Sequence, residues 1–185
     1  WGAYPSGFLH RARQLLGVGP QDAVLHICGG KIRDYPFRGF GPNDKTLDLD
    51  PALQPDFLMD ARHIGVGPEG TVPAPPGDGG LDGFWPAVLI DRPYTEEDAA
   101  HYLGGKGVEV LPEPNDLLHR SLSIVRPGGR VGFLDYYIPR PPKGTHFVAI
   151  VGVMMGYANR LRAYTVFERP RKPAPRVVLL EHGEL

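Results

Sequence analysis

The chain has 185 residues, 42% of them hydrophobic, which is enough for one domain with a sizeable buried core. Its formal net charge is −1, which excludes a bulk electrostatic attraction to nucleic acid, so any such binding needs a local basic patch. The single cysteine, Cys28, excludes an internal disulfide, and no apolar run reaches the roughly 18 residues of a membrane helix. Since no signal-peptide pattern is present either, we expect a cytoplasmic protein.

The first half of the chain predicts one helix and three short strands. Apolar residues at helical spacing predict a helix over residues 6–16. Short apolar runs predict buried strands over residues 23–27, 46–49 and 57–59. Between the first two strands, residues 31–45 show no helical period and contain two prolines and two glycines, so we expect an irregular loop there.

The second half alternates further strands with helices. Residues 65–83 hold 7 glycines and 4 prolines, which predicts an irregular surface loop. Strands are predicted over residues 85–90, 130–136, 146–153 and 161–167, and helices over residues 95–103 and 117–125. The triplet Pro127-Gly128-Gly129 predicts a turn that stops the second of these helices. We expect a single domain over residues 1–168 and a basic, proline-rich tail over residues 169–185, which could add an edge strand.

Alternating strands and helices predict an α/β fold in which a mostly parallel sheet carries helices on its faces. Ligands of such sheets bind beyond the carboxyl ends of the strands. That rule places four short segments at one edge of the sheet: the run Cys28-Gly29-Gly30 and the carboxylates of Asp48, Asp60 and Asp91. An acid after each of three strands predicts a binding site at this edge.

The apolar strand over residues 85–90 runs directly into Asp91-Arg92-Pro93-Tyr94. A carboxylate at a strand end can accept hydrogen bonds from an exocyclic amine, and the Arg92 carbonyl offers a second acceptor. Pro93 stiffens the turn by fixing φ, and the Tyr94 ring can stack on a planar base. The alternatives are that Asp91 caps the following helix and that Tyr94 packs at the rim of the sheet.

These four residues closely match the Asp-Pro-Pro-Tyr signature of methyltransferases that modify amino nitrogens of nucleobases, with Arg92 in place of the first proline. Four more segments, in the correct order, resemble other motifs of class I S-adenosylmethionine-dependent methyltransferases: residues 24–30, 46–51, 57–61 and 125–130. The resemblance covers residues 5–168 and is closest to the enzymes that methylate adenine N6 or cytosine N4 in DNA. It implies a Rossmann-like fold with a C-terminal antiparallel hairpin and S-adenosylmethionine as the cofactor.

The resemblance also implies which residues hold the cofactor: His26, Cys28, Gly29, Gly30, Asp48, Asp60 and Ala61. Asp48 would accept hydrogen bonds from both ribose hydroxyls, while Asp60 and the N–H of Ala61 would read the adenine edge. His26 stands where the family has an acid, and the loop over residues 31–45 stands where it has its first crossover helix. From the residues alone, His26 and Cys28 also suit packing roles in the core.

Basic and aromatic residues are interleaved in the loop over residues 31–45, in particular Lys31, Arg33, Tyr35, Phe37 and Arg38. Positive charges contact phosphates and aromatic faces stack on bases, so this composition predicts binding of single-stranded or flipped nucleic acid. The alternative is that the aromatic rings pack the loop onto the core while the charges are solvated. Four further cations flank the last two strands and could extend a phosphate-binding surface: Arg140, Lys143, Arg160 and Arg162.

The combined hypothesis is methyl transfer from S-adenosylmethionine to an exocyclic amino nitrogen of a nucleic-acid base, with DNA preferred over RNA. The two irregular loops leave little chain for target recognition, so we expect low sequence specificity or a protein partner that supplies it. Three alternatives stay open: an RNA base, a protein glutamine side chain, or a catalytically degenerate protein kept for binding or assembly. The 7 histidines show no metal-ligand spacing, and we predict no metal site.

Overall fold

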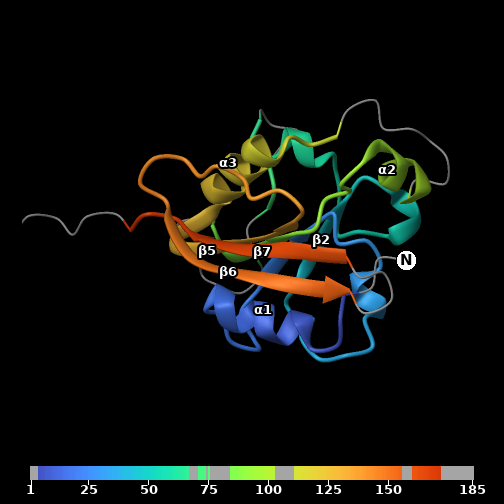
Figure 1. Cartoon of the computed structure of the whole chain (residues 1–185), viewed down its shortest axis with the longest axis horizontal. Helices are drawn as coiled ribbons and strands as arrows, with labels where there is room; N and C mark the ends of the chain where they lie inside the picture. The colour runs from blue at the N-terminus through green and yellow to red at the C-terminus, as the bar shows by residue number, and fades with distance from the viewer. Residues whose placement is uncertain are drawn as a thin grey trace, which may run out of the picture.

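The structure is a computed structural model, and it describes residues 4–66, 71–73, 75, 84–102, 111–155 and 160–171. Within these residues a seven-stranded sheet has the order β3-β2-β1-β4-β5-β7-β6 (Figure 1). Its strands are β1 (Val24–Ile27), β2 (Lys45–Asp48), β3 (Phe57–Leu58), β4 (Trp85–Ile90), β5 (Val125–Asp135), β6 (His146–Met155) and β7 (Arg160–Glu168). Strands β1 to β5 pair in parallel, whereas β7 runs antiparallel to both β5 and β6. The predicted α/β fold, with its mostly parallel sheet and C-terminal antiparallel hairpin, is therefore confirmed.

Helices cover both faces of the sheet, so each face has its own apolar core (Figure 1). Val24 of β1 belongs to the core on the face that α1 (Phe8–Leu16) covers. Its neighbour Leu25 belongs to the core on the opposite face, which α3 (Pro114–Ile124) covers. This alternation is the period-two pattern of a strand that is buried on both faces. Helix α2 (Glu96–Tyr102) follows β4.

The connection from β1 to β2 contains no α-helix, although residues 31–45 are described throughout. Its regular structure is one 3-10 turn, Ile32–Asp34. Two similar turns, Pro51–Leu53 and Ala61–His63, follow β2 and β3. The expectation of an irregular loop over residues 31–45 is confirmed, so the sheet edge lacks a helix N-terminus at this crossover.

A buried carboxylate, Asp44, ties this loop to the rest of the fold. Its oxygens accept hydrogen bonds from the backbone N–H groups of Val24 (2.9 Å) and Gly41 (2.7 Å). The same carboxylate pairs with Arg13 Nη1 at 2.8 Å and with His26 Nε2 at 3.0 Å. One side chain therefore links α1, β1 and the end of the loop inside the protein.

The predicted turn at Pro127-Gly128-Gly129 is wrong. Strand β5 follows α3 directly and runs through the triplet. Two backbone hydrogen bonds hold this segment against the chain that follows β7: Gly128 N–H donates to the Arg169 carbonyl (3.0 Å), and Arg169 N–H donates to the Gly129 carbonyl (2.9 Å). Proline and glycine favour a turn locally, but the hydrogen bonds with Arg169 hold the triplet in an extended strand. This pairing could not be read from the local sequence, because Arg169 lies far along the chain.

The predictions for most of the loop over residues 65–83, the end of the helix over residues 95–103 and almost all of the tail over residues 169–185 lie outside the described residues. Within the part of the chain that the structure describes, none of the helices has the length and apolar character needed to span a membrane.

Candidate functional site

The carboxyl ends of the parallel strands meet at one edge of the sheet and bring the sequence-predicted segments together. Ile27, at the end of β1, pairs with Leu47 of β2 and with Ile90 of β4. The next residues continue this register, because Cys28 N–H donates to the Leu47 carbonyl (2.9 Å) and Asp91 N–H donates to the Ile27 carbonyl (3.1 Å). Cys28 and Asp91 are therefore neighbours across two adjacent strand ends.

The Cys28 thiol lies among the three predicted acids. Burial raises the pKa of the thiol well above its usual range, and the negative charges of Asp48, Asp91 and Asp60 raise it further. A thiol with a raised pKa stays protonated near neutral pH and is a poor nucleophile. The thiol packs against the core of the face that α3 covers and suits a packing role.

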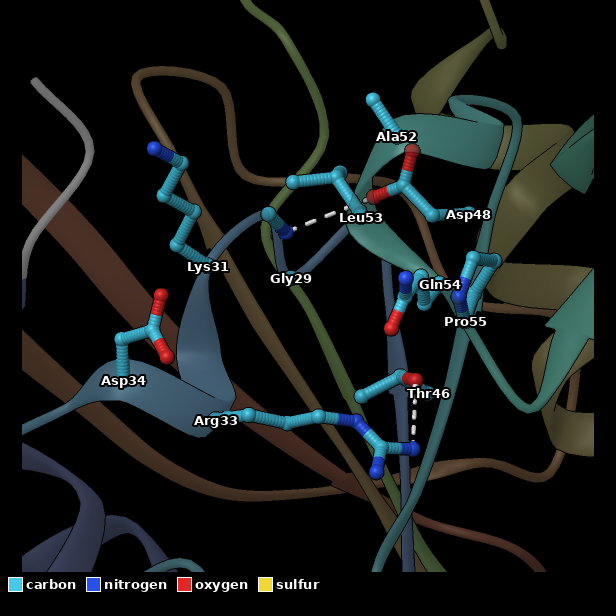
Figure 2. Close-up of a pocket in the computed structure, with 11 residues that line it drawn as sticks. Gly29, Lys31, Arg33, Asp34, Thr46, Asp48, Ala52, Leu53, Gln54 and Pro55 are labelled. Carbon is cyan, nitrogen blue, oxygen red and sulfur yellow. Dashed lines mark hydrogen bonds between the residues drawn. The ribbon is translucent and has the colours of Figure 1, made fainter.

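A pocket of about 360 Å³ opens beyond the ends of β1 and β2 (Figure 2). Its lining includes the backbone of Gly29 and Gly30, the carboxylate of Asp48 and the side chain of Lys31. Asp48 accepts hydrogen bonds from the N–H groups of Gly30 (3.3 Å) and Asp50 (3.1 Å). Burial raises the pKa of Asp48 despite these hydrogen bonds, which lower it. The pocket therefore presents one partly desolvated carboxylate beside a glycine backbone.

Other residues that the sequence assigned to the cofactor have partners of their own outside this pocket. Asp60 caps the 3-10 turn after β3, and it forms an ion pair with Arg62 at 2.6 Å. Burial opposes ionisation of Asp60, but the hydrogen bonds from Arg62 outweigh it and lower the pKa of this carboxyl. His26 is buried against Asp44, and Ala61 is buried at the start of the turn. Of the predicted cofactor residues, the pocket brings together Gly29, Gly30 and Asp48.

Asp91 forms the centre of a second, adjoining cluster of polar side chains. The Tyr94 hydroxyl donates a hydrogen bond to Asp91 Oδ1, and Arg162 Nη1 donates to the same oxygen at 3.3 Å. Arg162 Nη1 also donates to the Tyr94 hydroxyl, and its guanidinium carbon lies 5.2 Å from the centroid of the Tyr94 ring. The edge of the Tyr94 ring packs against Tyr136. This cluster joins the predicted motif to β7.

Burial dominates the electrostatics of Asp91. It raises the pKa of this carboxyl to about 6, although the positive charge of Arg162 and the hydroxyls of Tyr94 and Tyr4 lower it. A carboxylic acid with this pKa is mostly ionised at neutral pH and takes up a proton as the pH falls through about 6. A titratable group perturbed in this way, next to a pocket, is typical of functional sites.

Arg162 was offered by the sequence for a phosphate-binding surface, but it is buried and paired with Asp91. The sequence did hold a signal of this burial. In β7 Arg162 is in phase with the buried residues Tyr164 and Val166, and its own exposed fraction is 8%. A buried arginine requires a buried partner of opposite charge, so this period-two pattern already indicated an ion pair inside the protein. Which acid completes it could be known only from the fold.

Arg92, which stands at the position of the first proline in the signature that this motif resembles, is also buried and paired. Its Nε lies 2.7 Å from Asp135 Oδ2 at the end of β5, and its Nη1 donates to the Pro93 carbonyl at 3.0 Å. These contacts fix the turn after β4 to the neighbouring strand. The arginine therefore stiffens the motif through side-chain contacts, where a second proline would restrict the backbone.

The residues of the aromatic and basic loop divide between packing and exposure. Arg33 forms an ion pair with Asp56, and the Tyr35 hydroxyl donates to the Pro5 carbonyl at 2.6 Å. Lys31, Phe37 and Arg38 are exposed. Within the described residues, no group of three or more potential metal-ligating side chains gathers.

No family model and no curated protein matches the chain. Solved structures do resemble it: TrmN from Thermus thermophilus has a TM-score of 0.57 and 20% identity, over 87% of this chain and 48% of that one. The N-methyltransferase NodS from Bradyrhizobium japonicum WM9, in complex with S-adenosyl-L-homocysteine, has a TM-score of 0.53 and 12% identity, over 91% and 89%. The chain thus spans about half the length of TrmN. Its sheet order and these similarities establish a Rossmann-like class I methyltransferase fold.

Proposed function

We propose that this protein transfers a methyl group from S-adenosylmethionine to an exocyclic amino nitrogen of a nucleic-acid base. The observation that carries the proposal is the position of the Asp91–Tyr94 motif beside a glycine-lined pocket with a carboxylate, at the carboxyl edge of the sheet. Ligands of open α/β sheets bind at this edge. The similarity to NodS, an N-methyltransferase bound to S-adenosyl-L-homocysteine, supports the same assignment.

The residues at the pocket fit this cofactor. Gly30 has a φ of +56°, and a Cβ added there would meet no atom within 4 Å, so the backbone faces open space at this point. Asp48 offers carboxylate oxygens to hydroxyl donors, and a volume of about 360 Å³ is within the range of small-molecule sites. Gly29, Gly30 and Asp48 would hold the cofactor, and Lys31 would border it.

When bound, S-adenosylmethionine would supply an electrophilic methyl group. The protein's own groups would act on the target amine: the Asp91 carboxylate and the Arg92 carbonyl accept its hydrogens and orient the nitrogen lone pair. Pro93 fixes the turn, and the Tyr94 ring supports the base by stacking. The amine need not lose a proton before attack, so catalysis comes from positioning and from the electrostatics of a desolvated site.

Adenine N6 or cytosine N4 in DNA is the leading target within this proposal, and an amino group of an RNA base is the alternative. The exposed side chains of Lys31, Phe37 and Arg38 lie on the loop that borders the pocket. Exposed cations and an exposed ring suit single strands or flipped bases of either nucleic acid, because the contacts go to phosphates and π faces.

A second candidate is a binding protein that keeps the fold without catalysis. It is favoured by the 3-10 turn between β1 and β2, because the positive end of a crossover helix is missing beside the pocket. Calorimetric titration of S-adenosylmethionine, followed by single-turnover methylation of mixed DNA and RNA, separates the two candidates. Binding with methyl transfer supports the enzyme, whereas the absence of both supports the binding protein.

Asp48→Ala is expected to weaken S-adenosylmethionine binding by roughly 1.5–3 kcal/mol, because it removes a charge-assisted hydrogen bond to the ribose. The measurement is the dissociation constant by calorimetry. Asp34→Ala is the matched control, since it removes an exposed acid from the same pocket. Equal affinities for wild type and Asp48→Ala would remove Asp48 from the cofactor site.

Replacing both Lys31 and Arg38 with alanine is expected to reduce the salt dependence of nucleic-acid binding. Each lost phosphate contact lowers the slope of log K against log[salt] by about 0.7 for a single strand, so the double variant should lose about 1.4. Fluorescence anisotropy over a range of salt concentrations measures this slope. The control replaces Arg126 and Lys143, two exposed cations. The sequence offered Lys143 for a phosphate-binding surface, but the structure places it, like Arg126, near the opposite edge of the sheet from the pocket. An unchanged slope in the Lys31 and Arg38 variant would show that neither cation contacts a phosphate.

A further inference from the structure

The guanidinium of Arg162 contacts both groups that the proposed reaction directs at the base. Its Nη1 donates to Asp91 Oδ1, the carboxylate oxygen that also accepts from Tyr94. Its guanidinium carbon lies over the Tyr94 ring, 5.2 Å from the ring centroid, in a cation–π contact. Arg162 therefore bonds to the acceptor oxygen of Asp91 and also lies over the Tyr94 ring, the two groups that the proposed reaction needs for the base.

These contacts match the chemistry of the proposed target. A guanidinium and an aminated base are both planar, both carry N–H donors in the plane, and both present a π face to an aromatic ring. The carboxylate and ring that would receive an adenine or cytosine amino group can therefore receive the head group of Arg162 in the same way. A base cannot stack on the face of the Tyr94 ring that Arg162 covers while the guanidinium stays there, and its amino group would compete with Arg162 for Asp91 Oδ1, which also accepts from Tyr94.

We propose that Arg162 is an internal stand-in for the target base, and that base binding displaces its guanidinium from Asp91 and Tyr94. The inference rests on the proposed function, because it takes Asp91 and Tyr94 as the groups that receive the base. In the absence of a base, Arg162 pairs with the partly buried carboxylate of Asp91, which would otherwise be an unpaired charge at a desolvated site. The entering amine then replaces one N–H donor with another.

The position of Arg162 in the fold allows this exchange. It lies near the start of β7, and its neighbour Ala163 pairs with Asp135 at the end of β5, which places it at the same sheet edge as Asp91. The guanidinium is carried on a long, flexible stem. Its head group can therefore leave the site by rotations of the side chain, while β7 stays paired with β5 and β6.

Arg162→Met tests the inference, because methionine keeps an unbranched apolar stem but removes the charge and the donors. Arg162→Lys is the matched variant that keeps a cation. The first readout needs no ligand: an NMR titration of the Asp91 carboxyl. The positive charge of Arg162 and the hydroxyls of Tyr94 and Tyr4 lower the pKa of Asp91, whereas the negative charge of Asp135 raises it. The midpoint should lie near 6 in the wild type and higher in Arg162→Met.

The second readout is binding of a fluorescently labelled single-stranded oligodeoxyadenylate, measured by anisotropy without cofactor. Each protein is compared at a pH above its own Asp91 midpoint, so that the carboxylate is ionised in all of them. Arg162→Met should bind about ten-fold more tightly than the wild type, because the base no longer competes with an internal hydrogen bond and ring contact. Arg162→Lys, which keeps a donor for Asp91 but has no planar group for the Tyr94 ring, should bind with an affinity between those of the wild type and Arg162→Met.

The outcomes separate this inference from the proposed function. Equal or weaker binding by Arg162→Met, or an unchanged Asp91 midpoint, overturns the stand-in role. If the wild type still methylates the oligonucleotide in that case, the proposed function stands. If none of the three proteins binds this oligonucleotide or the mixed DNA and RNA substrates, both the inference and the nucleic-acid substrate are overturned. A thermal melt of each variant confirms that the comparison is between folded proteins.

Discussion

Replacing Asp91 with asparagine is expected to slow methyl transfer by about 10²–10³-fold while the fold stays intact. The amide is nearly isosteric with the carboxylate, but it is uncharged and accepts hydrogen bonds more weakly. It can still accept from the Tyr94 hydroxyl and from Arg162, the two side chains that bond to Asp91 Oδ1. Because Arg162 loses its counter-charge, we expect a lower melting temperature for a protein that is still folded. The expected loss of methyl transfer therefore falls on the target amine, whose lone pair would be oriented less well.

Single-turnover methylation of mixed DNA and RNA substrates measures this effect, and a thermal melt and an S-adenosylmethionine titration accompany it. Asp116→Asn, on an exposed position of α3, is the control. If Asp91 acted only as a helix cap, the asparagine variant would keep its activity and Asp91→Ala would lose about 1 kcal/mol of stability. Full activity in Asp91→Asn would therefore refute the catalytic assignment.

The sheet edge could be predicted from sequence because its signals are local. Short apolar runs followed by Gly29, Gly30, Asp48 or Asp91 mark strand ends, and the alternation of strands and helices places these ends together. The same local signal does not decide which of these acids faces the pocket. Asp60 carries the same signal as Asp48, yet its carboxylate pairs with a nearby arginine and lies away from the pocket lining.

Two buried cations, Arg162 and Arg13, pair with acids that lie far from them in the sequence. Arg162 reaches Asp91 only because β7 inserts antiparallel next to β5, and no spacing in the sequence announces that pairing. Arg13 reaches Asp44 only because α1 packs beside the loop that precedes β2. In both cases a buried charge in a periodic element signals that a partner exists, while the sheet order decides which acid it is.

Asp44→Asn is expected to lower the free energy of unfolding by about 3–5 kcal/mol, the largest loss of stability that we predict for a single substitution. The Asp44 carboxylate is buried and pairs with both Arg13 and His26. Asparagine would leave the Arg13 guanidinium buried without a counter-charge. Val24 and Gly41 donate to different oxygens of Asp44, so the NH₂ group of asparagine would face one of these two N–H donors. Urea unfolding at about pH 7 measures the loss.

The pH dependence of this loss identifies the charge as its cause. Burial opposes ionisation of Asp44, but the interactions with His26, Gly41 and Arg13 outweigh it and lower the pKa of this carboxyl below its ordinary value of 3.8. An acid with a lowered folded-state pKa stabilises the protein above its unfolded pKa and loses that contribution as the pH falls through the folded pKa. The difference in the free energy of unfolding between wild type and Asp44→Asn should therefore be largest near neutral pH and should become smaller below pH 3.8.

Adding Arg13→Met to Asp44→Asn should recover part of the lost stability, since it removes the unpaired cation. A single variant as stable as the wild type at neutral pH would show that the fold does not depend on this charge.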